Sequence, residues 1–246
     1  MATVKEHYDN HLGNFYSWMT GNFVSRQAEF HDFLIKHELL PHITKKAIDL
    51  GAGHGIQTIP LAKVGYSVKS LDFNIKLLSE LTANTRGMDV KIIHGDIREI
   101  DQFSGFNPEL IVCCGDTLLH LDSKQDIEQL IYGIASILVK DGKLLLTFRD
   151  YSTTLTGNDR FIPVKSDENK ILTCILDYEP DFVNVTDLLH ERNKDGWKQK
   201  ISSYKKVRVK SNEIIEIIER NGMIVQDAQI VNRLITIIAY KNKIIC

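Results

Sequence analysis

Short apolar runs alternate with longer amphipathic segments along the chain from Ala47 onward. A short apolar run predicts a buried strand, and apolar residues that recur every three or four positions predict a helix. Regular alternation of the two is typical of βαβ units built around a mostly parallel sheet. The strands predicted in this way lie at 47–50, 66–71, 90–94, 110–114 and 143–148.

Helical segments are predicted in the intervals between these strands. The clearest begins at Ser123, because Ser123 and Asp126 resemble a capping box and the apolar residues that follow keep helical spacing. Pro60 lies inside another predicted helix, where its missing N–H is a cost unless the residue falls in the first turn. The predicted helices lie at 56–64, 72–84 and 123–138.

The pattern changes after Asp150, where β-prone segments are separated by polar turns. This change predicts an antiparallel insertion. A helix at 212–220 and two further β-prone segments then bring the main sheet to seven strands. The β-prone segments lie at 171–176, 183–189 and 200–209 in the insertion, and at 223–230 and 233–240 in the sheet.

The predicted fold class is therefore α/β, with a Rossmann-like, doubly wound and mostly parallel seven-stranded sheet. We predict one domain over residues 1–246. Its parts are a helical, aromatic-rich N-terminal lid at 1–45, which packs on the sheet or over its mouth, a core at 46–150, an antiparallel substrate-side insertion at 151–210 and a C-terminal part at 211–246.

The charges are nearly balanced, with 30 Lys and Arg against 32 Asp and Glu and a net charge of −2. No global field recruits a polyanion or an anionic membrane, so we expect neither nucleic acid nor a membrane as a partner. The first residues lack the pattern of a secretion signal, and no apolar run approaches the roughly 20 residues that a bilayer requires. A soluble, cytoplasmic protein is expected.

The four cysteines do not form a recognisable framework. Cys113 and Cys114 are adjacent, whereas Cys174 and Cys246 stand alone. Neither zinc spacing nor a disulfide pattern fits this distribution. We expect four reduced thiols and no metal site.

A cluster of glycines follows the first predicted strand, at the sheet edge where open α/β folds bind ligands. Read from Gly51, a dinucleotide fingerprint would place its third glycine at Ile56, and read from Gly53 it would place it at Thr58. No Gly-Lys-Ser/Thr follows, so a P-loop fails as well. The turn is therefore suited to a close approach of the backbone to a ligand, without a dinucleotide or P-loop spacing.

The motif Asp-x-Gly-x-Gly-x-Gly from Asp49 resembles the first motif of the class I S-adenosylmethionine-dependent methyltransferases. The fit is physical, because S-adenosylmethionine carries no pyrophosphate and needs close backbone approach. Asp72 ends the second predicted strand, where a carboxylate can accept both ribose hydroxyls. Asp96 and Ile97 follow the third strand and resemble the adenine site of this family, with the carboxylate on the exocyclic amine and the next backbone amide on a ring nitrogen.

Three segments outside the glycine loop resemble glycine N-methyltransferases and their small-molecule relatives: Ser-Arg-Gln-Ala-Glu-Phe at 25–30, Cys-Cys-Gly-Asp-Thr at 113–117 and Phe-Arg-Asp-Tyr at 148–151. The resemblance implies that Arg26 pairs with the carboxylate of the cofactor's methionine part, and that Tyr16 packs near the cofactor. It further implies that Arg149 holds a carboxylate of the methyl acceptor. Asp116 stands where these enzymes usually carry Asn, which puts glycine itself in doubt as the acceptor. Two alternatives are open: Asp116 receives a cationic nitrogen, or Asp116 and Arg149 neutralise each other and leave specificity to the insertion.

The predicted site residues form two groups. The acceptor side consists of Asp116 and Arg149. The cofactor side consists of Tyr16, Arg26, Gly51, Ala52, Gly53, Asp72, Phe73, Asp96, Ile97 and Cys114.

The resemblance implies methyl transfer from S-adenosylmethionine to a small molecule, with nitrogen preferred over oxygen as the nucleophile. Asp116, Tyr151 and Tyr178 are candidates to assist deprotonation of an amine, and none is assigned as the base. His54 and His120 are expected to be structural, hydrogen-bonded histidines. The alternatives are a non-catalytic sensor of S-adenosylmethionine or S-adenosylhomocysteine and, third, a nicotinamide oxidoreductase. A homo-oligomer is left open.

Overall fold

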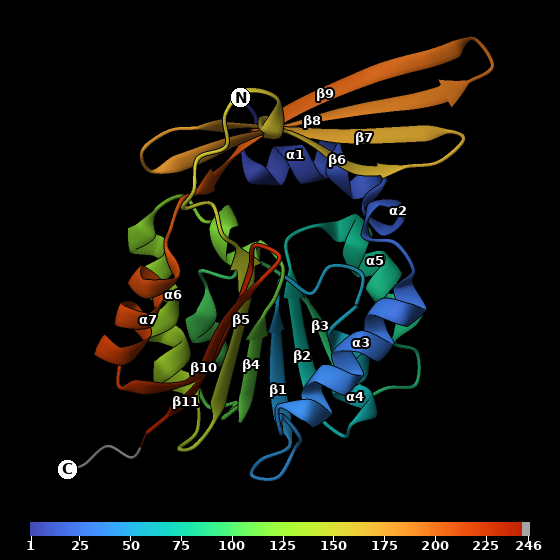
Figure 1. Cartoon of the computed structure of the whole chain (residues 1–246). Helices are drawn as coiled ribbons and strands as arrows, with labels where there is room; N and C mark the ends of the chain where they lie inside the picture. The colour runs from blue at the N-terminus through green and yellow to red at the C-terminus, as the bar shows by residue number, and fades with distance from the viewer. Residues whose placement is uncertain (243–246) are drawn as a thin grey trace.

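The computed structural model describes residues 1–242 and contains a large sheet of seven strands (Figure 1). The strand order is β10-β11-β5-β4-β1-β2-β3. Neighbours from β3 to β5 are parallel, whereas β11 runs antiparallel to both β5 and β10. This confirms the predicted fold class. The strands are β1 (Lys46–Leu50), β2 (Ser67–Asp72), β3 (Val90–His94), β4 (Leu110–Cys113), β5 (Lys143–Arg149), β10 (Met223–Val231) and β11 (Leu234–Lys241).

Helices cover both faces of the large sheet, so that β1 and β4 are buried on both sides (Figure 1). One core cluster joins Ile48 to α6 and α7, and the other joins Ala47 to Leu34 of α3 and Leu61 of α4. The covering helices are α3 (Phe23–Lys36), α4 (Thr58–Lys63), α5 (Ile75–Asn84), α6 (Lys124–Ile137) and α7 (Ser211–Arg220).

Pro60 is accommodated because α4 begins at Thr58, two residues later than predicted. Pro60 is thus the third residue of the helix. Backbone N–H groups in the first turn have no partner within the helix, so proline costs no helical hydrogen bond there.

The insertion forms a separate antiparallel sheet with the strand order β6-β7-β8-β9. Three of its strands were predicted. The fourth, β6, was not predicted from the sequence, because Pro163 interrupts it; the structure places this strand at the sheet edge with an irregularity after Pro163, where proline is tolerated. The strands are β6 (Phe161–Ser166), β7 (Lys170–Tyr178), β8 (Phe182–Asn193) and β9 (Gly196–Val207).

The predicted helical N-terminus divides into two parts. Helix α1 (Val4–Asn10) lies between the small sheet and the carboxyl ends of the large sheet, and α2 (Tyr16–Thr20) follows it at the same rim (Figure 1). His7 fastens α1 to β9, since its ring stacks on Tyr204 at 4.0 Å and its Nδ1 lies 2.8 Å from Ser202 Oγ. Helix α3 packs on the large sheet. Within residues 1–242, no helix is long and apolar enough to cross a bilayer.

Candidate functional site

The glycine loop after β1 is held against the end of β2. Gly51 has φ +74°, and its N–H and that of Ala52 donate to the Leu71 carbonyl at 2.8 and 3.0 Å. A Cβ on Gly51 would lie 2.4 Å from side-chain atoms of Thr117, so this glycine is needed for packing. Gly53, at φ +53°, differs: a Cβ there would meet nothing closer than Tyr16 Cε1, at 3.6 Å.

Asp72 connects this loop to the next strand. Its Oδ2 accepts the Gly53 N–H at 2.8 Å, and its Oδ1 accepts the Asn74 N–H at 2.8 Å. Burial raises the pKa of Asp72, against the lowering effect of these backbone hydrogen bonds. Each carboxylate oxygen retains a lone pair. Gly53 and Asp72, which were predicted separately, are therefore in direct contact, and Asp72 retains acceptor capacity for a ligand.

Tyr16 is the first residue of α2, which places it beside the glycine loop. Burial, together with the charges of Asp72 and Asp116, raises the pKa of Tyr16 to about 12 against the opposing charges of Lys206 and Arg26. The phenol is therefore protonated at neutral pH. Tyr16 also borders the open side of Gly53.

Arg26 and Phe73 lie near this centre without a fixed contact to the carboxylates. The Arg26 side chain is 56% exposed, and its only ion pair is with exposed Glu29 at 3.5 Å in the described part of the chain. Exposed pairs of this kind contribute little, so the guanidinium is available to another anion. Phe73 packs edge-on against the ring of Tyr8, with 5.4 Å between ring centroids.

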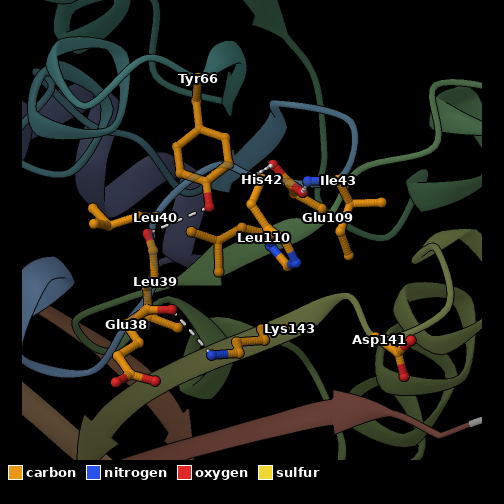
Figure 2. Close-up of a pocket in the computed structure, with 10 residues that line it drawn as sticks. All are labelled: Glu38, Leu39, Leu40, His42, Ile43, Tyr66, Glu109, Leu110, Asp141 and Lys143. Carbon is orange, nitrogen blue, oxygen red and sulfur yellow. Dashed lines mark hydrogen bonds between the residues drawn. The ribbon is translucent and has the colours of Figure 1, made fainter.

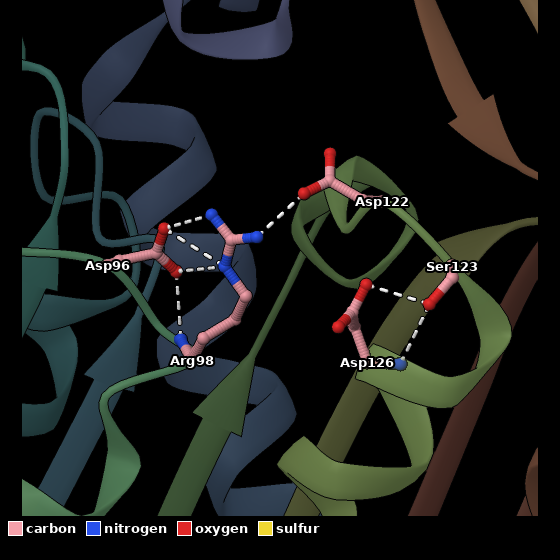
Figure 3. Close-up of polar contacts among 5 residues, drawn as sticks. All are labelled: Asp96, Arg98, Asp122, Ser123 and Asp126. Atoms are coloured by element: carbon pink, nitrogen blue, oxygen red, sulfur yellow. Dashed lines mark hydrogen bonds and ion pairs between the residues drawn. The ribbon is translucent and has the colours of Figure 1, made fainter.

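Asp96 has a partner that the sequence analysis missed (Figure 3). Arg98 donates from Nη2 to Asp96 Oδ2 at 2.6 Å, and its Nη1 donates to Asp122 at 2.6 Å. Burial acts to raise the pKa of Asp96, and the hydrogen bonds from Arg98 lower it overall. The Asp96 carboxylate is therefore ionised, and Arg98 orients it. An adenine that binds here would share this carboxylate with Arg98. The side chain of Ile97 is buried in the main core, leaving its backbone for a ligand.

The predicted acceptor-side residues Asp116 and Arg149 are in contact, and Asp116 has a further partner that was not predicted, Lys206 on β9. Lys206 Nζ donates to Asp116 Oδ2 at 2.5 Å and lies 3.4 Å from the Tyr151 hydroxyl. The Arg149 backbone N–H donates to Asp116 Oδ1 at 2.9 Å, whereas its Nε lies 3.5 Å from Oδ2. One feature of the sequence pointed to such a residue. Lys205 and Lys206 are consecutive in a strand, so their side chains point to opposite faces and one of the two lysines faces inward.

The charges at this site follow from burial and pairing. Burial acts to raise the pKa of Asp116, but Lys206 and Arg149 together lower it to about 2. Burial and the charge of Lys206 lower the pKa of His120 to about 3. Burial raises the pKa of Tyr151 to about 12. At neutral pH the site thus holds an ionised Asp116, a neutral imidazole and a protonated phenol.

The two histidines singled out from the sequence differ in their surroundings. His54 is buried, stacks on Phe23 at 4.7 Å and has Nε2 3.5 Å from Thr20 Oγ1, which fits a structural role. His120 was expected to be hydrogen-bonded, but its Nε2 is buried and has no hydrogen-bond partner within residues 1–242. The Tyr178 hydroxyl is likewise buried without a hydrogen-bond partner among these residues.

The thiols are free in the described part of the chain, which includes Cys113, Cys114 and Cys174. Burial raises the pKa of the Cys114 thiol well above its ordinary value. Cys174 donates to Asp187 at 2.9 Å. Cys246 lies outside the described residues. Across residues 1–242, no group of three His, Cys, Asp or Glu side chains is arranged to hold a metal ion.

A small pocket lies at the opposite edge of the sheet, by the amino ends of β4 and β5 (Figure 2). There the Glu109 carboxylate accepts backbone N–H groups from His42, Ile43, Thr44 and Lys45. The pocket has a volume of about 50 Å³, which is space for only a few water molecules. The Glu109 hydrogen bonds hold the loop at residues 42–45, and the pocket is too small for a nucleoside.

The comparisons with known proteins agree with this geometry. Residues 47–142 match the methyltransferase domain family. The chain is 28% identical over 136 residues to a glycine/sarcosine N-methyltransferase of Aphanothece halophytica, covering 54% of this chain and 51% of that protein. It is 26% identical over 185 residues to the glycine N-methyltransferase of Mus musculus, covering 68% and 63%. The chain thus spans about half to two thirds of the length of these relatives.

Solved structures share the fold over nearly the whole chain. A S-adenosylmethionine-dependent methyltransferase from Clostridium acetobutylicum superimposes with a TM-score of 0.74 at 17% identity, covering 89% of this chain and 92% of that one. The CcbJ methyltransferase from Streptomyces caelestis gives 0.78 at 14% identity, covering 97% and 99%. Residues 47–142 thus carry a methyltransferase domain, and the chain shares its fold with S-adenosylmethionine-dependent methyltransferases, which together support a class I methyltransferase. Within this class, its sequence is similar to glycine and glycine/sarcosine N-methyltransferases.

Proposed function

We propose that this protein transfers the methyl group of S-adenosylmethionine to a nitrogen of a small acceptor that carries an anionic group. The observation that carries the proposal is that the glycine loop touches the loops after both β2 and β4: Gly53 donates to Asp72 Oδ2 at 2.8 Å, and an added Cβ on Gly51 would lie 2.4 Å from Thr117, the residue after Asp116. Cofactor-type and acceptor-type residues thus share one rim of the sheet. The similarity to glycine/sarcosine N-methyltransferases supports nitrogen as the nucleophile.

The residues after β1 and β2 fit S-adenosylmethionine. Gly53 leaves a space that a Cβ would occupy, and Asp72 retains lone pairs for ribose hydroxyls. Asp96 and the Ile97 backbone would hold the adenine, while Arg26 would reach the methionine carboxylate. When bound, S-adenosylmethionine supplies a methyl group on a positively charged sulfur.

On the predicted acceptor side, the pKa values of Asp116, His120 and Tyr151 do not suit a general base near neutral pH. Asp116 is too acidic at about 2, His120 is likewise too weak a base at about 3, and Tyr151 stays protonated. The acceptor amine must therefore arrive with its lone pair free. The chain's contribution is orientation and exclusion of water. We expect kcat/KM to rise with pH until the acceptor's own ammonium group is deprotonated.

The test is a screen of amino acids, amines and small carboxylates for release of S-adenosylhomocysteine, together with calorimetric titration of S-adenosylmethionine. Turnover with at least one amine-bearing acceptor is expected. Cofactor binding without turnover for any acceptor would favour a sensor. Thermal stabilisation by NAD(P) in place of S-adenosylmethionine would contradict the proposal.

A further inference from the structure

We infer that Lys206 determines which acceptor charge the site prefers. Lys206 pairs with the Asp116 carboxylate, which would otherwise neutralise Arg149. The inference rests on the proposed function and deepens it. It assigns to a lysine of the small sheet the specificity for acceptors that carry a carboxylate.

Two cations share a single oxygen of Asp116. Lys206 Nζ donates to Oδ2 at 2.5 Å, and Arg149 Nε lies 3.5 Å from the same atom. The Lys206 side chain is 8% exposed, whereas that of Arg149 is 63% exposed. A short contact away from water is the stronger of the two, because solvent screens the exposed one. Asp116 is therefore neutralised by Lys206, and the guanidinium of Arg149 remains available to a ligand.

The surrounding groups do not remove this free charge. Asp187, on the neighbouring strand, accepts the Cys174 thiol at 2.9 Å, and its Oδ2 lies 3.2 Å from His7 Nε2. Tyr151 and Tyr204 place their rings beside the Lys206 ammonium, with 5.6 Å from Nζ to each centroid, and bring no charge at neutral pH. An acceptor anion is thus the natural partner of Arg149.

Removal of Lys206 would change the preference of the site. In Lys206→Met, Arg149 is the remaining cationic partner of Asp116. The two side chains then neutralise each other, and the site no longer favours an anionic ligand. In the double variant Lys206→Met/Asp116→Asn, Arg149 again lacks an anionic partner, and the preference of the site for an anionic ligand returns. The double variant also removes the buried carboxylate that has lost its shorter ion pair, which lessens the cost of the substitution to folding.

The adjacent lysine offers a matched control. Lys205 points to the other face of β9, where its Nζ lies 3.7 Å from Glu179 and over the ring of Phe182. Lys205→Met changes the same residue type one position away without touching Asp116. It is expected to behave as the unmodified protein.

The experiment measures thermal stabilisation of the S-adenosylhomocysteine-loaded protein by acetate and by methylammonium, as minimal anionic and cationic probes. The unmodified protein and Lys205→Met should be stabilised by acetate. Lys206→Met should bind acetate about tenfold to a hundredfold more weakly, and the double variant should recover it. Equal responses of all variants, or no acetate effect in the unmodified protein, would overturn the inference. Failure of the proposed function has a different signature, namely no release of S-adenosylhomocysteine by the unmodified protein.

Discussion

The substitution Gly53→Ala tests whether Gly53 faces the cofactor, in contrast to Gly51, which packs against the protein. The new Cβ would lie 3.6 Å from Tyr16 Cε1, an ordinary contact, so the protein itself has room for it. The cost to folding is the φ of +53°, about 1–2 kcal/mol for a residue with a Cβ. For a chain of this size that corresponds to a fall in Tm of about 2–8 °C. The methyl group would, however, occupy the space assigned to the cofactor.

Crowding of a filled site by one methyl costs about 1–3 kcal/mol, so the Kd for S-adenosylmethionine should rise about 5-fold to 150-fold. Calorimetry gives the Kd and thermal denaturation gives the Tm. Gly87→Ala is the control, because Gly87 has φ +78° and nothing within 4 Å of its added Cβ. Gly51→Ala should instead lose mainly stability, through its contact with Thr117. If Gly53→Ala and Gly87→Ala lowered Tm alike and bound the cofactor equally well, the reasoning would be refuted.

Three further predictions concern carboxylates and Arg149. Asp72→Asn should weaken S-adenosylmethionine binding by about tenfold or more, since the amide loses the charge and one acceptor; an unchanged calorimetric Kd would remove Asp72 from the site. Burial raises the pKa of Asp49 to about 7, so the folded state prefers the protonated form. Stability should therefore fall as pH rises from about 4 to about 7, by up to roughly 1.4 kcal/mol per pH unit. Asp49→Asn should flatten that slope in denaturant titrations, and an unaltered slope would contradict the assignment. Arg149→Ala keeps the backbone hydrogen bond to Asp116 and should lower kcat/KM for carboxylate-bearing acceptors by about tenfold or more, with cofactor affinity unchanged.

The local pattern of the chain was sufficient for most of the fold. Strand β3 was predicted at its observed bounds, and the Ser123 cap of α6 is present, with Ser123 Oγ accepting the Asp126 N–H at 3.1 Å (Figure 3). Strand β6 was missed because propensity penalises Pro163 regardless of whether the strand is at an edge. The position of a residue within a sheet is a tertiary property, and a single sequence does not contain it.

The site was predicted only as far as it follows strand ends. Gly53 and Asp72 follow the ends of adjacent parallel strands, so their contact could be expected from topology alone. Arg98 and Lys206 could not be placed in the same way. The Arg98 guanidinium also binds Asp122, which lies in a different loop. Lys206 belongs to the small sheet, whose position over the rim depends on α1 and on other contacts distant in sequence.

The most direct measurement is a crystal structure of the protein with S-adenosylhomocysteine. The account predicts ribose hydroxyls about 2.5–3.0 Å from the Asp72 carboxylate, with the nucleoside passing beside Gly53 and the sulfur directed toward Asp116 and Lys206. A nucleoside bound elsewhere, or one at this rim with its sulfur directed away from Asp116, would contradict it.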